Sequence, residues 1–155
     1  MTREQAYIIA HDQVHQYIRT HGMRKSADRD LVLFAMYSLT GMHTVDEIHE
    51  QLVRTHPRNH PSRTTVYNSL ELFHQLGLVM KHNLSEQQFY YEVNLGDACH
   101  IFTRCTICGQ INKIRDRHIR ESLLSKHYTK FTPVPYEVVI NGICKKCSQK
   151  GKNKK

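Results

Sequence analysis

The chain has 155 residues, of which 39% are hydrophobic and 23% are charged, which is enough for one ordinary domain or two small ones. No stretch approaches the roughly 20 apolar residues that span a bilayer, and the N-terminus lacks the apolar core of a signal peptide. These features argue against membrane and secreted proteins. We therefore expect a cytoplasmic protein with no membrane partner.

The net charge of +8 permits nucleic-acid binding without establishing it. Residues 1–82 carry nine Lys and Arg against eight Asp and Glu, a net charge of +1. Residues 83–155 carry thirteen against six, a net charge of +7, and six of these cations are lysines after residue 144. We interpret residues 149–155 as a disordered basic tail rather than as a binding arm.

Three helices are predicted in the first third of the chain. Residues 4–20 have a loosely helical apolar spacing that ends before Gly22, and residues 28–39 are apolar on most faces, as in a helix at the centre of a small bundle. Thr44 and Glu47 have the spacing of a capping box, in which each side chain binds the other's backbone N–H. They predict the start of the third helix.

A fourth helix is predicted over residues 63–75, with Ser62 as its N-terminal cap and the apolar residues Val66, Leu70 and Phe73 on one face. The opposite face carries Arg63, Thr64, Thr65, Tyr67, Asn68 and Glu71. A helix that reads the major groove presents its first residues to base edges, where Asn pairs with adenine and Arg with guanine or phosphate. By itself this pattern fits a merely solvated face as well.

From residue 78 onward, apolar and polar residues alternate in several short runs, as in β-strands. Residues 78–81 and 88–93 predict a hairpin, and helices followed by a hairpin indicate a winged helix. The runs IFTRC, QINKI and YEVVI predict three further strands, interrupted by a helix over residues 117–127. We predict an α+β protein with a winged-helix domain in residues 1–84, a hinge in 85–96 and a small α/β domain in 97–148.

Four cysteines form two CxxC turns separated by 35 residues, namely Cys105, Cys108, Cys144 and Cys147. Zinc prefers four soft ligands in a tetrahedron, and each CxxC turn supplies two, so we predict a structural zinc ion that joins the start of the second domain to its end. A redox-active dithiol pair and simple burial are the alternatives. The fifth thiol, Cys99, is interpreted as a small buried residue, with a ligand or sensor role as the alternative.

Nothing in the sequence indicates catalysis. It has no Ser, His and Asp constellation and no phosphate-binding glycine loop, and a zinc ion with four cysteine ligands has no open position. We therefore predict that the protein is not an enzyme.

With the helix start SRTTVYNSLELFHQLGLV and the turns CTICG and GICKKC, the chain resembles the ferric uptake regulator family from about Gly22 to Cys147. The resemblance implies a winged helix, a hinge and an α/β dimerisation domain. It also implies a homodimer that binds a palindromic double-stranded DNA operator when a regulatory metal is bound. The residues predicted to contact DNA are Arg24, Ser62, Arg63, Thr64, Thr65, Tyr67 and Asn68.

Within that set the resemblance implies distinct roles. Tyr67 and Asn68 face bases, Thr64 and Thr65 contact phosphates, and Arg24 approaches the DNA backbone or the minor groove.

The regulatory metal site matches the family pattern only in part. Glu86 fits the acid of the hinge and His100 fits the first histidine of a His-x-His pair. The other positions of the pattern carry different residues: Phe102 replaces the second histidine, Lys113 replaces a later acid and Met42 replaces an early histidine. His43 adjoins that last position, and Cys99 is a substitute donor. The regulatory ligand set is therefore Glu86, His100, His43 and Cys99.

These observations predict a dimeric, sequence-specific transcription repressor of the ferric uptake regulator type. Its effector is Fe²⁺, Zn²⁺, Mn²⁺ or heme. The alternative is a thiol-based peroxide sensor in which oxidation of the zinc cysteines or of Cys99 releases the metal.

Overall fold

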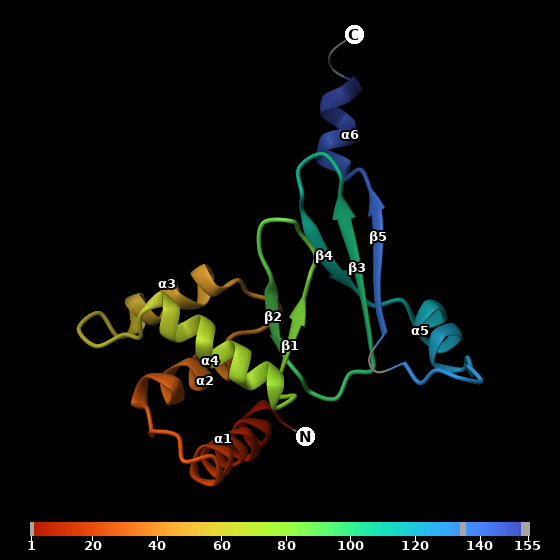
Figure 1. The fold of residues 1–155 in the computed structure, drawn as a ribbon. Coiled ribbons are helices and arrows are strands. Elements are labelled where there is room, and N and C mark those ends of the chain that lie inside the picture. The colour runs from red at the N-terminus through yellow and green to blue at the C-terminus, as the bar shows by residue number, and fades with distance from the viewer. Residues whose placement is uncertain (1, 134–135, 153–155) are drawn as a thin grey trace. The chain divides into compact units, whose positions relative to one another are not determined.

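The computed structural model describes residues 2–133 and 136–152 and divides into two units, one up to Leu95 and one from Gly96 (Figure 1). The first unit consists of helices and a hairpin, and the second contains a three-stranded sheet. This is the predicted α+β class. In the described residues, no helix combines the length and the apolar character that crossing a bilayer requires.

The helices of the first unit are α1 (Arg3–Thr20), α2 (Ala27–Ser38), α3 (Val45–Thr55) and α4 (Arg63–Gln75). The predicted capping box of α3 is confirmed: the Thr44 hydroxyl accepts a hydrogen bond from the Glu47 N–H at 3.2 Å, and the Glu47 carboxylate accepts one from the Thr44 N–H at 2.8 Å. At the start of α4, the Ser62 hydroxyl accepts a hydrogen bond from the Thr65 N–H at 3.1 Å. Both caps act within one turn of chain, which explains why the sequence located these helices correctly.

An antiparallel hairpin of β1 (Val79–His82) and β2 (Tyr90–Val93) follows α4. Strand β2 lies inside the segment 85–96 that we assigned to a hinge, so that assignment is corrected: residues 90–93 belong to the wing. Residues 90–93 are fixed because β2 pairs with a second segment besides β1. The backbone of Tyr91 exchanges two hydrogen bonds with that of His43, at 2.7 and 2.9 Å, and this ties β2 to the loop that precedes α3.

The core of the first unit lies between its helices and the hairpin. The predicted apolar stripe of α4 is fully buried there, with Val66, Leu70 and Phe73 all at 0% exposure. Each such side chain contributes roughly 1.5–3 kcal/mol to folding. The buried residues around them include Val14, Ile18, Val32, Leu33, Met36, Ile48, Leu52 and Tyr91. Because one face of α4 is fixed in this core, the opposite face is held toward solvent.

The second unit is built on the central strand β3 (Cys99–Cys105). It pairs antiparallel with β4 (Ile111–Ile114) and parallel with β5 (Tyr136–Gly142), giving the order β4-β3-β5. Helix α5 (Arg117–Leu124) connects the two outer strands and ends three residues before its predicted end. The three strand-like runs of the sequence are thus confirmed.

Helix α6 (Lys145–Lys152) corrects the predicted tail. We expected residues 149–155 to be disordered, but residues 149–152 continue a helix that starts at the second CxxC turn. Its first backbone hydrogen bond runs from the Ser148 N–H to the Cys144 carbonyl at 3.0 Å, and lysine is a good helix former. Residues 153–155 lie outside the described part of the chain.

Candidate metal centres and DNA-binding surface

The four cysteines of the two CxxC turns meet at one end of the second unit. Cys105 ends β3 and Cys108 lies in the following turn, while Cys144 precedes α6 and Cys147 lies in its first turn. Their four sulfur atoms are all within 4.8 Å of one another, and the sulfurs of Cys108 and Cys144 are 3.7 Å apart. The parallel pairing of β3 with β5 explains this, because it sets Cys105 opposite Gly142.

Backbone hydrogen bonds hold the two turns together. The Thr106 N–H donates to the Gly142 carbonyl at 2.8 Å, and the Cys144 N–H donates to the Cys105 sulfur at 3.3 Å. Gly109 has a φ of 74°, a left-handed conformation that glycine adopts without strain, and it closes the first turn. The quartet is therefore formed by the fold itself.

The electrostatics of the quartet favour a cation at its centre. Backbone N–H groups of Cys108 and then of Cys144 point at the Cys105 sulfur and lower the pKa of that thiol to about 6. Hydrogen bonding to Cys144 and then burial raise the pKa of Cys147 to about 12, and repulsion from the Cys105 thiolate adds a smaller contribution. Four soft sulfur donors at this spacing fit zinc, which would take the place of the shared protons.

The first residues of α4 form an exposed polar surface. Tyr67 is 44% exposed, and Ser62, Thr64 and Asn68 are exposed as well, whereas Thr65 is half-buried and helps to cap the helix. Ser62, Thr64, Tyr67 and Asn68 thus face solvent, as the sequence indicated, and their contacts to DNA stay a prediction. Arg24 lies in the loop before α2, also exposed.

Arg63, one of the predicted DNA contacts, has a partner within the protein. Its guanidinium forms a two-pronged ion pair with Asp46 in the first turn of α3, through Nε to Oδ1 and through Nη2 to Oδ2 at 3.3 Å. The hydrogen bond from the Arg63 guanidinium is the main reason why the pKa of the Asp46 carboxyl is lowered. The pair joins α3 to α4 at the protein surface, and the contact of Arg63 with DNA stays a prediction.

The wing is tied to the C-terminal half of α4. Glu71 accepts hydrogen bonds from Lys81 Nζ at 2.8 Å and from the Tyr91 hydroxyl at 2.7 Å. The Lys81 ammonium also lies 4.2 Å from the centre of the Phe89 ring. Despite burial, these two hydrogen bonds lower the pKa of Glu71. Glu71 therefore serves the fold, although the sequence placed it on the solvent face of the helix.

The predicted regulatory ligands Glu86, His43 and Cys99 belong to none of the ligand clusters in the described part of the chain. Glu86 is exposed in the turn of the hairpin. His43 is half-buried, with its Nε2 2.9 Å from the Thr40 carbonyl and its Nδ1 3.9 Å from Glu47. The structure thus gives His43 a role in the loop between α2 and α3.

Cys99 and His100 start β3 in the second unit, and both are buried. Burial raises the pKa of the Cys99 thiol, which makes it a poor nucleophile and a poor ligand. His100 Nε2 is 3.1 Å from the Asp97 carbonyl oxygen, and Arg120 forms an ion pair with the Asp97 carboxylate. His100 remains a candidate ligand from the sequence.

Phe102 and Lys113 stand at two positions where the resemblance implies metal ligands, and they are direct partners across β3 and β4. Phe102 is fully buried and Lys113 is exposed. An apolar ring opposite a cation offers no donor to a divalent metal. The two positions at which the sequence lacks the expected ligands therefore lie side by side in the sheet.

The hairpin holds a histidine and an acid that sequence reasoning missed, His82 and Glu92. His82 Nε2 lies 3.5 Å from a Glu92 carboxylate oxygen; the histidine side chain is fully buried and that of the glutamate is 15% exposed. In the register of β1 and β2, His82 pairs with Tyr90 and Met80 with Glu92, so both side chains share one face. The predicted first strand ended at residue 81, one residue before His82. Extending it by one residue and applying period-two alternation could have found this pair.

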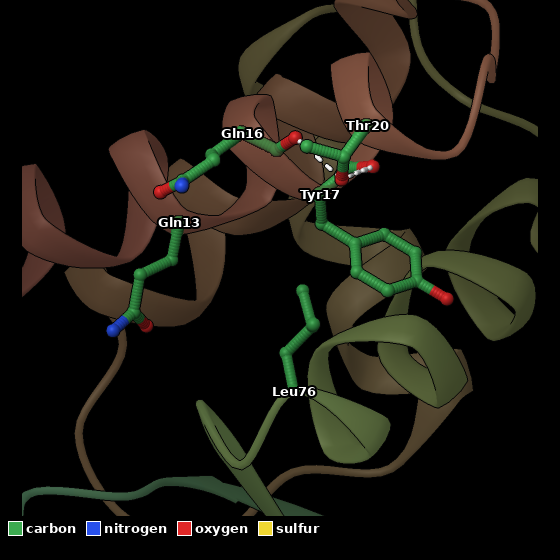
Figure 2. A pocket seen from close by; sticks show the side chains of 5 residues that line it. All are labelled: Gln13, Gln16, Tyr17, Thr20 and Leu76. Carbon is green, nitrogen blue, oxygen red and sulfur yellow. Dashed lines mark hydrogen bonds between the residues drawn. The ribbon is translucent and has the colours of Figure 1, made fainter.

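A shallow pocket of about 300 Å³ lies beside α1 in the first unit (Figure 2). The residues that line it are Gln13, Gln16, Tyr17, Thr20 and Leu76. The Thr20 hydroxyl donates to the Gln16 carbonyl at 3.0 Å, as the dashed lines show. A lining of amides, hydroxyls and one leucine supplies neither a metal-ligand set nor positive charge, so we assign no effector to this pocket.

Comparison with known proteins identifies the family of the chain. The model of the ferric uptake regulator family matches residues 20–141. The peroxide-responsive repressor PerR of Staphylococcus epidermidis is 27% identical over 135 residues, which cover 86% of this chain and 87% of that protein. PerR of Staphylococcus aureus (strain USA300) is 28% identical over 134 residues, 86% of this chain and 88% of its own.

Solved structures show the same fold. The ferric uptake regulator Fur of Helicobacter pylori has a TM-score of 0.70 at 19% identity and covers 92% of this chain and 93% of its own. The ferric uptake regulator of Pseudomonas aeruginosa with manganese has a TM-score of 0.68 at 20% identity, covering 84% of this chain and 97% of its own. The family model matches well over half of the residues, and the chain therefore belongs to the ferric uptake regulator family of metal-responsive transcription regulators.

Proposed function

We propose that this protein is a homodimeric repressor that binds a palindromic DNA operator in the cytoplasm when a regulatory metal is bound. The observation that carries this proposal is the start of α4, where Thr64, Tyr67 and Asn68 are exposed on a helix whose other face is locked in the core. Such a helix keeps its shape when it enters the major groove, so base contacts form at little cost in conformational entropy.

The second unit supports dimerisation. Helix α5 has no buried residue among those the structure describes, although its sequence is amphipathic. Several large apolar side chains of this unit are between 41% and 66% exposed, namely Ile107, Leu124, Tyr128, Phe131, Ile140 and Ile143. Strand β5 pairs on one side with β3 and, within the described residues, with no strand on the other. An apolar surface beside an open strand edge is the kind of surface that a second copy of the chain covers.

The structural metal we propose for the cysteine quartet is zinc. Zinc in a four-thiolate shell has no open position, so this ion stabilises the second unit and takes no part in sensing.

For the regulatory metal we propose the pair His82 and Glu92 as ligands in the first unit, in place of Glu86. An imidazole beside a carboxylate suits Fe²⁺, Mn²⁺ or Zn²⁺.

The experiment that tests the proposed function starts from the metal and heme content of the purified protein. Operator sequences are then selected from random DNA, and binding is titrated in the presence of Fe²⁺, Mn²⁺, Zn²⁺ or heme. We expect palindromic sequences and an affinity that rises at least tenfold with one of these effectors. An affinity that no effector changes would contradict the proposed sensing, and failure to select any sequence would contradict the proposed repressor.

Replacement of Glu92 by glutamine tests the regulatory pair. Glutamine keeps the shape of the side chain but removes the charge that a divalent ion requires. Loss of a group that only supports a ligand already weakens metal affinity by about 10- to 100-fold, so loss of a ligand should cost at least as much. We expect half-maximal operator binding of Glu92→Gln to need correspondingly more metal. Glu86→Gln, with the same chemical change on an exposed turn, should behave like the wild type. Equal metal dependence of all three proteins would contradict the assignment.

Peroxide sensing by thiols is the second candidate function, since the two staphylococcal relatives are peroxide-responsive repressors. The buried Cys99, with its raised pKa, disfavours a route through that thiol. With Mn²⁺ as the regulatory metal, we expect one equivalent of hydrogen peroxide per chain to leave both the zinc and the operator affinity unchanged. Zinc release together with loss of operator binding at that dose would support the thiol sensor instead.

A further inference from the structure

A second cluster of metal-ligating side chains lies in the first unit, between α1 and α2. It consists of His11 and His15 on α1 and Asp30 in the first turn of α2. One ligand atom of each residue lies within 4.8 Å of the others, and His15 Nε2 is 3.0 Å from Asp30 Oδ1. The rings of His11 and His15 are 4.2 Å apart between centroids. The three groups therefore converge on one point.

Rigid elements hold these side chains. His11 and His15 are four residues apart, so they lie on the same face of α1, one turn above the other. The buried residues Ala10 and Val14 fix the adjoining face of the helix in the core. At the opposite end of α2, the Arg3 guanidinium donates to the Tyr37 carbonyl at 3.2 Å and to the Met36 carbonyl at 3.3 Å. Both helices are thus positioned before any ion arrives.

The cluster is accessible from solvent. The side chains of His11, His15 and Asp30 are 36%, 25% and 35% exposed, respectively. A further carboxylate is near, because Asp12 Oδ1 lies 3.9 Å from His11 Nδ1 and its side chain is 81% exposed. An ion from solution can therefore reach the three ligands, with water for a further position; Asp12 is not part of the cluster.

The donor set determines which ion fits. Two imidazoles and one carboxylate suit borderline divalent ions such as Zn²⁺, Ni²⁺ and Co²⁺, while Mg²⁺ and Ca²⁺ prefer oxygen alone. Bonds of about 2.1 Å in a tetrahedron place ligand atoms about 3.4 Å apart. His15 and Asp30 are 3.0 Å apart, and the ligand atom of His11 lies within 4.8 Å of both. A simple ion pair accounts for His15 and Asp30. The His11 ring also contacts the rings of Tyr7 and His15, at 5.9 and 4.2 Å between centroids, and a metal ion would add a common partner for the three groups.

The family match does not account for this cluster either. The family model begins at residue 20, and both histidines precede it. They are also distinct from the cysteine quartet and from the pair His82 and Glu92. We propose that His11, His15 and Asp30 form an accessory site for a borderline divalent transition-metal ion, which fastens α1 to α2 in the DNA-binding unit. This site is independent of the proposed regulatory metal.

Nickel titration of the full-length, zinc-loaded protein tests the site. Calorimetry with Ni²⁺ alone gives the number of ions bound, and NMR locates them, since paramagnetic Ni²⁺ broadens signals of nearby residues. We expect His15→Ala to bind one ion fewer than the wild type and to lose the broadening around Asp30. His118→Ala, which removes an exposed histidine of α5, should retain both. Asp30→Asn keeps the side-chain shape and should weaken this binding at least tenfold.

Two results would contradict the proposed accessory site. If the wild type and His15→Ala bind equal numbers of ions, or if broadening is absent around α1, the site does not exist and the pair is only a salt bridge. Helicity and thermal unfolding measured without Ni²⁺ show whether the variants fold, and Asp30→Asn becomes the test variant if His15→Ala does not fold. Bound Ni²⁺ at 100 times its dissociation constant should also raise the folded-to-unfolded ratio about 100-fold in the wild type. Operator binding is a separate readout, so failure of the proposed repressor function would leave this result standing.

Discussion

Replacement of Cys144 by serine is expected to release the zinc ion and dissociate the dimer together. The Cys144 sulfur lies 3.7 Å from that of Cys108, and its backbone N–H donates to the sulfur of Cys105. A serine hydroxyl stays protonated at neutral pH and offers zinc no soft anionic donor. The variant should therefore contain no zinc, against one ion per chain in the wild type.

Dissociation is expected because the free energy that zinc contributes to folding is as large as the whole stability of a small domain. Structural zinc contributes about 10–16 kcal/mol in small zinc-dependent domains, whereas a whole domain is stable by only about 5–15 kcal/mol. In the second unit, α5 has no buried residue among those described, so its own core is small. Without zinc, only the β3–β5 pairing and the hydrogen bonds between the two turns hold this end of the unit together, and we expect the apolar surface proposed for the dimer to lose its shape.

Metal analysis and sedimentation measure the two effects on the same sample. Cys99→Ser is the matched control, because it removes a thiol outside the quartet and should leave one zinc ion per chain and a dimer. A Cys144→Ser protein that is zinc-free and still a stable dimer would show that zinc does not hold this unit together. A variant that keeps its zinc would contradict the four-cysteine site itself.

The second large effect is expected for alanine at Tyr67 or Asn68. A base contact by a well-placed side chain is worth about 1–3 kcal/mol, so each variant should bind the selected operator about 5- to 150-fold more weakly. Neither side chain is buried, so folding should be unaffected. Zinc content and the dimer should therefore match those of the wild type.

The measurement is operator affinity at fixed salt and fixed regulatory metal, since phosphate contacts make every such affinity depend on salt. Gln75→Ala changes an exposed residue at the far end of the same helix and should bind like the wild type. If Tyr67→Ala and Asn68→Ala also retain full affinity, α4 does not read the bases. In that case the DNA-binding surface must lie elsewhere in the first unit.

Local chemistry was enough to determine much of this protein from its sequence. A capping box acts within one turn, and this placed the start of α3 at Thr44; Ser62 did the same for α4. Two CxxC turns predicted the cysteine quartet, because each turn by itself brings two thiols together. The polar face of α4 followed from helical period alone.

Only the tertiary structure decided which distant side chains meet. His82 and Glu92 become neighbours through the register of the hairpin, and Asp30 reaches the two histidines of α1 through the packing of α2. The pairing of Arg63 with Asp46 likewise depends on how α3 and α4 pack. Register and helix packing are set by the whole core, where many weak contacts add up. Short-range patterns hold no such information, which is why the sequence indicated Glu86 as a ligand and Glu92 became a candidate only from the fold.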